Sequence, residues 1–151
     1  MNVLGRVFMK IASDDPFTCI ERMLSEAKRE QYDASFLDIH AEATSEKRAI
    51  AEAFDGVIDV IVGTHTHVQT NDAATLRKGT AFLTDAGMCG PEHSVLGVDP
   101  AIIIHKFRTQ TPMRHELAEG PCVVQACVAR VGEENGRMET IRMTSVLMTS
   151  S

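Results

Sequence analysis

The amino-acid sequence predicts an α/β domain of layered helices and sheet with an antiparallel β-rich C-terminal end. Three observations support this class. Amphipathic helical segments alternate with short apolar runs in the first two thirds of the chain, one of these runs is apolar on both faces, and the last third changes to segments with period-two patterning. We therefore expect one domain over residues 1–151.

The first half of the chain has the order strand, helix, strand, helix. A short apolar opening forms the first strand. Asp15 and the proline after it are typical of a helix start, and apolar residues then recur at helical spacing. The segment 33–40 follows as a short strand that ends at His40.

The next helix and strand are bounded by residues with known terminal preferences. Thr44 or Ser45 can cap a helix that Gly56 ends. The run 57–62 is apolar apart from Asp59, as expected for a central strand covered by helices on both sides.

The last third of the chain predicts one more helix and several strands. A strand over 80–88 precedes a helix that starts with Asp99 and a proline. Segments 114–120 and 122–145 have strand patterning, and Asn135-Gly136 in the latter indicates a hairpin. Residues 143–151 are expected to form a flexible tail.

Composition excludes several classes of function. The net charge is −6 and basic residues never cluster beyond two, so a surface for duplex nucleic acid is not expected. No apolar run approaches the roughly 18 residues of a membrane span, and no signal peptide is recognisable. The four cysteines form no CxxC pair. We expect a cytoplasmic protein without a disulfide framework.

The histidines are placed where α/β proteins bind ligands. His40 ends one predicted strand, and His65 and His67 follow another. The carboxyl ends of parallel strands converge at one edge of a sheet, and imidazole is a common ligand of Zn, Fe and Mn. The pattern indicates a metal site, although histidines that only bond a carbonyl would give the same pattern.

Four motifs in order strengthen the metal hypothesis. "DIHAEATSEK" at 38–47, "VGTHTHVQTND" at 62–72, "TDAGMCGP" at 84–91 and "SVLG" at 94–97 resemble the YmdB-like branch of the calcineurin-type metallophosphoesterases. The resemblance runs from Gly5 to Gly120. It implies part of an α/β/β/α sandwich and hydrolysis of phosphodiesters, notably cyclic nucleotides, at a centre of two divalent transition-metal ions (Fe, Mn or Zn).

The resemblance also implies roles for individual residues. It makes His40 and His65 ligands of one ion and His67 a ligand of the other. Two close cations can activate a water and stabilise charge on the phosphoryl oxygens. No residue of this chain is assigned as catalytic. The residues expected to orient the ligands or form the substrate wall are Asp38, Glu42, Asp72, Gly87, Gly90 and His93.

The resemblance covers only the C-terminal half of the family's domain. The carboxylate and Gly-Asn-His motifs of its N-terminal half are not found here, and neutral imidazoles alone would leave two dications repelling each other. We expect an incomplete domain with little or no activity alone. It could be a fragment, could pair with a chain that supplies the N-terminal half, or could form a homo-oligomer.

Two other functions stay open at this point. The chain could be a non-enzymatic module or subunit that binds a metal or a nucleotide. It could also be a hydrolase with one zinc ion held by His40, His65 and His67.

Overall fold

The structure is a computed structural model that describes residues 1–10, 12–27, 32–131 and, for the backbone, 139–148. The predicted mixed α/β class is confirmed. The chain divides into two compact units, the first built mainly from Met1–Gly87 and the second mainly from Met88–Ala126. Among the described residues, no helix has the length and apolar character to cross a membrane.

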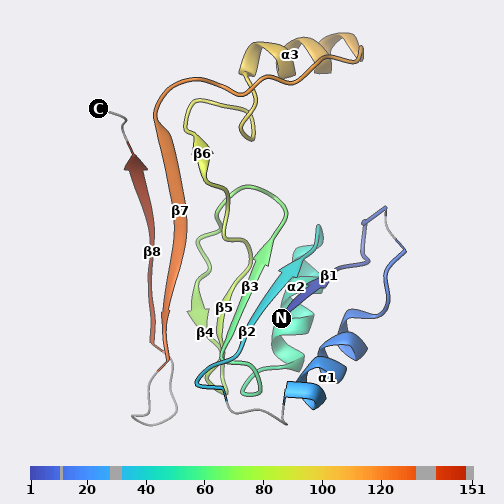
Figure 1. Cartoon of the computed structure of the whole chain (residues 1–151), viewed down its shortest axis with the longest axis vertical. Helices are drawn as coiled ribbons and strands as arrows, with labels where there is room; N and C mark the ends of the chain where they lie inside the picture. Colours follow the sequence, from blue (N-terminus) through green and yellow to red (C-terminus); the bar gives the residue numbers. More distant parts are fainter. Residues whose placement is uncertain (11, 28–31, 132–138, 149–151) are drawn as a thin grey trace. The chain divides into compact units, whose positions relative to one another are not determined.

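The first unit is built on a five-stranded sheet with the order β1-β2-β3-β5-β4 (Figure 1). All neighbouring strands are parallel except β4, which runs antiparallel to β5. The strands are β1 (Asn2–Leu4), β2 (Phe36–His40), β3 (Val60–Thr64), β4 (Ala74–Thr75) and β5 (Ala81–Leu83).

Two helices cover one face of this sheet. They are α1 (Pro16–Ala27) and α2 (Thr44–Ala53). The apolar core joins Ile20 of α1 and Ile50 of α2 to residues of the strands, all shielded from solvent. Because side chains alternate along a strand, the buried strand residues lie on a single face, called here the helix side. Those of β1, β2 and β3 are Val3, Leu37, Ile39 and Ile61.

The opposite face, called here the open side, is only partly covered. Phe36 is 51% exposed, and Val60 and Val62 are half-buried. Both helices of the first unit, α1 and α2, contribute to the helix-side core, so neither of them provides the helical cover that was expected on the second face of β3. The strand itself begins only at Val60, and its apolar open-side residues Val60 and Val62 are half-buried.

Two of the described helices begin at an Asp-Pro pair, as predicted. The Asp15 carboxylate accepts hydrogen bonds from the backbone N–H and the hydroxyl of Thr18. Asp99 caps α3 (Pro100–Thr109) by accepting the N–H of Ala101. The expected cap of α2 is wrong: its N-cap is Ala43, which makes no side-chain bond, because Thr44 is already inside the helix.

The second unit contains α3, the strand β6 (Gly90–Pro91) and the first part of β7 (Cys122–Arg130), to which β6 runs antiparallel. These strands and β8 (Glu139–Met148) form a three-stranded sheet with the order β6-β7-β8. The Asn135-Gly136 turn lies outside the described residues. Strand β8 includes residues 143–148 of the segment expected as a tail, and 149–151 lie outside the described part.

Two strand predictions need correction. Segment 114–120 is not a strand, because only Leu117 forms a bridge, to Val98, and no partner strand runs beside the remainder. The strand expected over 80–88 ends at Leu83, where the chain turns through residues that bond the histidine loop described below.

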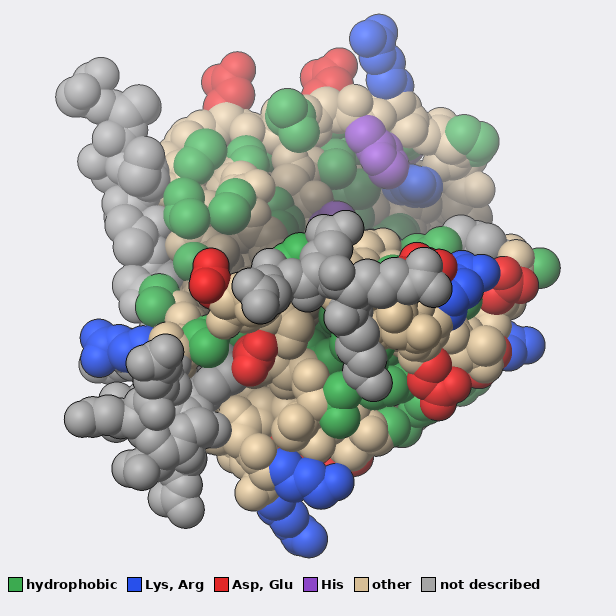
Figure 2. All heavy atoms as spheres, turned by 60° about the horizontal axis from the view of Figure 1, so that its bottom comes forward, with side chains coloured by type: hydrophobic (Ala, Val, Ile, Leu, Met, Phe, Trp, Pro, Cys, Tyr) green, Lys and Arg blue, Asp and Glu red, His purple; other side chains and the backbone are tan. Residues whose placement is uncertain are grey.

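Charged side chains are scattered over the surface. On the face drawn in Figure 2, Lys and Arg side chains lie among Asp and Glu rather than in one basic patch. This distribution agrees with the net charge of −6 and with the absence of basic clusters in the sequence.

Candidate functional site

The carboxyl ends of β2 and β3 bring the predicted histidines to one edge of the sheet. His40 is the last residue of β2, and it pairs in register with Thr64, the last residue of β3. His65 follows directly and begins the loop of residues 65–70, called here the histidine loop. Parallel pairing of the two strands therefore places residues 25 positions apart side by side.

His40 is held by a hydrogen-bond relay on the open side of the sheet. The Thr64 hydroxyl donates to Asp38 Oδ1 at 2.9 Å, and His40 Nδ1 lies 3.0 Å from the same hydroxyl. Since the hydroxyl has one proton and gives it to Asp38, His40 Nδ1 must donate to Thr64. The Nε2 atom of a neutral His40 then keeps its lone pair, which is the tautomer that can bind a cation.

The lone pair of His40 faces the second histidine. His65 Nδ1 lies 3.1 Å from His40 Nε2, and the two rings meet edge to face with centroids 4.9 Å apart. On its other side, His65 Nε2 lies 2.8 Å from Glu42 Oε2. The predicted residues Asp38, His40, Glu42 and His65 thus form one connected group with Thr64.

His67 does not join this group through any described contact. It is exposed, and it lies two residues along the histidine loop with φ of 64°. Within residues 1–10, 12–27 and 32–131, no group of three His, Cys, Asp or Glu side chains is arranged to hold a metal ion.

The ring nitrogens of His40 and His65 are suitable donors for a transition metal, but two donors are fewer than such a site usually has. Two nitrogens that each lie about 2.0–2.1 Å from a tetrahedral ion are about 3.3 Å apart, close to the observed 3.1 Å. Imidazole nitrogens are donors that Zn, Mn and Fe accept. A protein-bound catalytic zinc usually has three protein ligands, so the described residues make up part of such a site.

The other predicted residues have structural partners or lie in the second unit. Asp72 accepts from the hydroxyls of Thr70 and Thr84 and from the N–H of Thr84. Burial tends to raise the pKa of Asp72, but these bonds outweigh burial and lower it. Gly87, with φ of 80°, donates its N–H to Asp85. Gly90 belongs to β6, and His93 is exposed and lies 3.9 Å from Glu92.

Sequence reasoning missed a buried ion pair beneath the histidine loop. Lys47 Nζ of α2 lies 2.9 Å from Asp85 Oδ2, and both side chains are completely buried. A signal was present in the sequence, because Lys47 stands three and four residues before Ile50 and Ala51 on the buried stripe of α2. A charged residue at such a position requires a buried partner.

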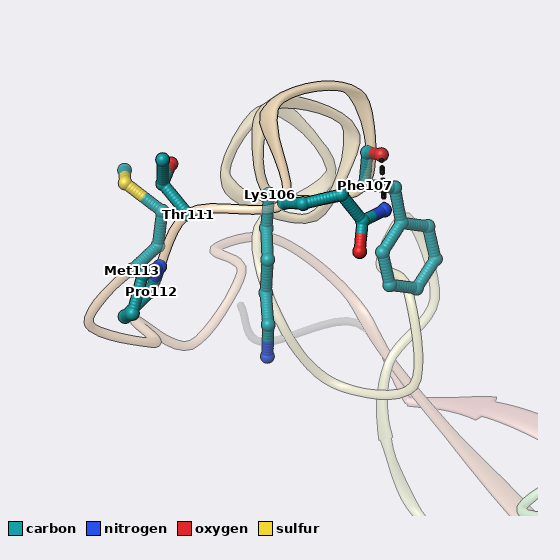
Figure 3. A pocket seen from close by; sticks show the side chains of 6 residues that line it. Lys106, Phe107, Thr111, Pro112 and Met113 are labelled. Carbon is teal, nitrogen blue, oxygen red and sulfur yellow. Dashed lines mark hydrogen bonds between the residues drawn. The ribbon is translucent and has the colours of Figure 1, made fainter.

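A separate cavity of about 350 Å³ lies in the second unit. Its lining residues come from the end of α3 and the segment after it, and Figure 3 labels Lys106 and Phe107 of the helix and Thr111, Pro112 and Met113 of that segment. The Gln110 side-chain amide donates to the Phe107 carbonyl. None of the predicted site residues lines it. The residues around it are Lys106, Phe107, Gln110, Thr111, Pro112 and Met113.

In open α/β sheets, ligands gather at the carboxyl ends of the parallel strands, and this is the edge at which the chain presents His40, His65 and Glu42. The chain belongs to the family described as YmdB-like protein, which it matches over residues 1–144. The family is one of phosphodiesterases and phosphatases, as the names of the relatives indicate.

Two curated relatives carry names that describe an activity. The chain is 44% identical over 135 residues to a 2′,3′-cyclic-nucleotide 2′-phosphodiesterase of Bacillus subtilis (strain 168), covering 89% of this chain and 50% of that protein. It is 43% identical over 108 residues to a putative phosphatase/phosphodiesterase of Mycoplasma pneumoniae, covering 70% of this chain and 37% of that protein. The chain thus spans half or less of the length of these relatives.

Two solved structures have the same fold. A hypothetical protein from Thermus thermophilus superposes with a TM-score of 0.86 at 39% identity, covering 97% of this chain and 56% of that one. A novel phosphatase from Mycoplasma pneumoniae gives a TM-score of 0.84 at 31% identity, covering 98% of this chain and 52% of that one.

Proposed function

We propose that this chain supplies the histidine side of a metal-dependent phosphodiesterase centre that acts on cyclic nucleotides or similar small phosphodiesters. The observation that carries the proposal is the His40–His65 pair, with nitrogens 3.1 Å apart and one tautomer selected by Thr64 and Asp38. Membership of the YmdB-like family and the activity named for the Bacillus subtilis relative support the substrate class.

Each residue of the group has a proposed task. His40 and His65 hold one divalent ion through ring nitrogens, and His67 serves a second ion. Asp38, acting through Thr64, keeps the proton of His40 on Nδ1, while Glu42 orients His65 from its other side. When bound, the ions would supply an activated water and neutralise charge on the phosphoryl oxygens. Gly87 is proposed to contact the substrate, and Asp72 to support the loop.

The metal-binding side chains among the described residues are too few for two ions, so further ligands are needed to complete the centre. We propose that carboxylate ligands come from a region equivalent to the unmatched half of the relatives or from another copy of this chain. In support, the described residues gather no three-donor group, and the open side of the sheet is only partly covered.

A binding module without turnover is the second candidate, since a two-donor group can hold a ligand without completing a reaction centre. Hydrolysis of adenosine 2′,3′-cyclic phosphate with Mn²⁺ separates the two. It would be measured for this chain alone and after addition of the unmatched half of the Bacillus subtilis relative.

We expect little hydrolysis alone, at least a tenfold increase on addition, and loss of that increase in His40→Ala. Hydrolysis in no combination would contradict the enzymatic proposal. Full activity of the chain alone would contradict the need for the unmatched half or for another copy.

A further inference from the structure

The buried Lys47–Asp85 ion pair lies against the main chain of the histidine loop. Nζ and Oδ2 are 2.9 Å apart, and neither side chain is exposed. A buried pair of this kind is weak evidence for stability, because apolar residues of similar volume often do as well. Because stability alone does not explain this ion pair, the other hydrogen bonds that Asp85 makes indicate its function.

Asp85 bonds the histidine loop at two points. Its Oδ2 accepts the N–H of Thr66 at 3.0 Å, and Thr66 is the residue between the two histidines. Its backbone carbonyl accepts the N–H of Thr70 at 3.1 Å, and its backbone N–H donates to the Thr70 hydroxyl. The Asp85 side chain thus holds the middle of the loop at Thr66, and the Asp85 main chain holds its end at Thr70.

The loop needs such fixing because its conformation is unfavourable. His65 and His67 have φ values of 126° and 64°, a region that side-chain-bearing residues rarely adopt. Backbone of this kind persists only when surrounding contacts hold it. The Thr66 N–H, which lies between the two positive-φ residues, bonds a buried carboxylate that also accepts the N–H of Gly87.

Lys47 reaches the carboxylate past Gly63 of β3. A Cβ at Gly63 would lie 2.7 Å from Lys47 Cδ and 1.8 Å from the Thr84 carbonyl oxygen, so only glycine fits. Burial would raise the pKa of Asp85, but Lys47 and the N–H groups of Thr66 and Gly87 lower it below the ordinary value. The carboxylate is therefore an anion, the stronger acceptor for those N–H groups.

We propose that Asp85 and Lys47 are positioning residues for the histidine loop. Asp85 holds the Thr66 N–H so that the His65 ring meets His40, and Lys47 holds the Asp85 carboxylate in place. Neither touches the substrate. This inference rests on the proposed function in one respect, because it takes His40 and His65 to be metal ligands. The conformation of the histidine loop can be tested without metal.

The test compares Co²⁺ affinity and amide hydrogen exchange in the full chain and its variants. Lys47→Met/Asp85→Asn removes both charges, so no buried charge is left unpaired. Asp85→Glu keeps the charge but moves the carboxylate by one methylene. We expect both variants to bind Co²⁺ about 10- to 100-fold more weakly, the usual loss when a group that orients a ligand is changed. The Thr66 amide should exchange at least tenfold faster, while the Ile61 amide in β3 is unchanged.

Glu52→Gln is the matched control, because it breaks the exposed Arg48–Glu52 pair on the same helix and should change neither measurement. A folded variant with unchanged Co²⁺ affinity and unchanged Thr66 exchange would overturn the inference. If the parent chain binds no Co²⁺, the metal part of the proposed function fails, and Thr66 exchange alone decides the inference. If the double variant does not fold, Asp85→Glu decides it by the same two readings.

Discussion

The two sides of the sheet in the first unit carry different kinds of residue. On the helix side, Leu37 and Ile39 of β2 are completely buried and pack in the core. On the open side, Asp38 and His40 of the same strand belong to the hydrogen-bonded group of the candidate site. Because side chains alternate along the five residues of β2, the residues that stabilise the core and the residues of the candidate site lie on opposite faces.

This comparison predicts where substitutions act. Changes on the helix side should lower the free energy of unfolding, and changes on the open side should alter the histidines with little effect on stability. Lys47 and Asp85 connect the two sides, since they are buried beside Gly63 yet bond the loop that carries His65.

The largest effect is expected for Lys47→Met. It leaves the buried Asp85 carboxylate without its cation, and breaking a buried pair in this way costs about 3–5 kcal/mol. Urea unfolding followed by circular dichroism measures the loss. The double variant Lys47→Met/Asp85→Asn should recover much of it, and equal losses in the two variants would show that the unpaired charge is not the cause.

Acidification should weaken the same contact. The pKa of Asp85 is lowered in the folded chain, so its stabilisation is present above the ordinary carboxyl pKa of about 4 and is lost as the pH falls through the lower folded pKa. Unfolding free energies measured between pH 6 and pH 3 should fall toward pH 3. The fall should be smaller in Lys47→Met/Asp85→Asn, which retains only other groups such as Asp72.

A conservative substitution in the core shows how strongly the helix side contributes to the free energy of unfolding. Ile39→Val removes one buried methylene and should cost about 1 kcal/mol. Chemical shifts of the His40 ring should stay unchanged, although Ile39 is its sequence neighbour. A shifted His40 ring would show that the two sides are not separable.

Thr64→Val should have the smallest effect on stability and a clear effect on the histidine. The hydroxyl bonds partly exposed groups that water can replace, so we expect a loss of about 0.5 kcal/mol. Without its acceptor, His40 Nδ1 loses its preference for the proton. Nitrogen NMR of the imidazole should change from one tautomer to a mixture, and an unchanged spectrum would contradict the relay from Asp38.

The sequence alone predicts the elements with strong local signals. Asp15 and Asp99 mark helix starts, and the last residue of β2 is His40 as expected, because capping and strand ends depend on neighbouring residues. The predicted cap of α2 was wrong because the helix already includes Thr44, so that Ala43 is the N-cap. The predicted strand over 114–120 was wrong because a strand also needs a partner beside it in space, which local patterning does not reveal.

The candidate site was predictable only in part, for a similar reason. Histidines at strand ends can be seen in the sequence, and so can a carboxylate such as Glu42 nearby. The pairing of Lys47 with Asp85, 38 residues away, and the relay through Thr64 require the register of the parallel strands. No local pattern encodes that register.

The most direct test of the His40–His65 metal site is a Co²⁺ titration of this chain followed by visible absorption. We expect a saturable ligand-field band that is lost in His40→Ala and His65→Ala and retained in His93→Ala, whose histidine is exposed in the second unit. No band, or a band that survives in His40→Ala and His65→Ala, would contradict the assignment of this histidine pair as metal ligands.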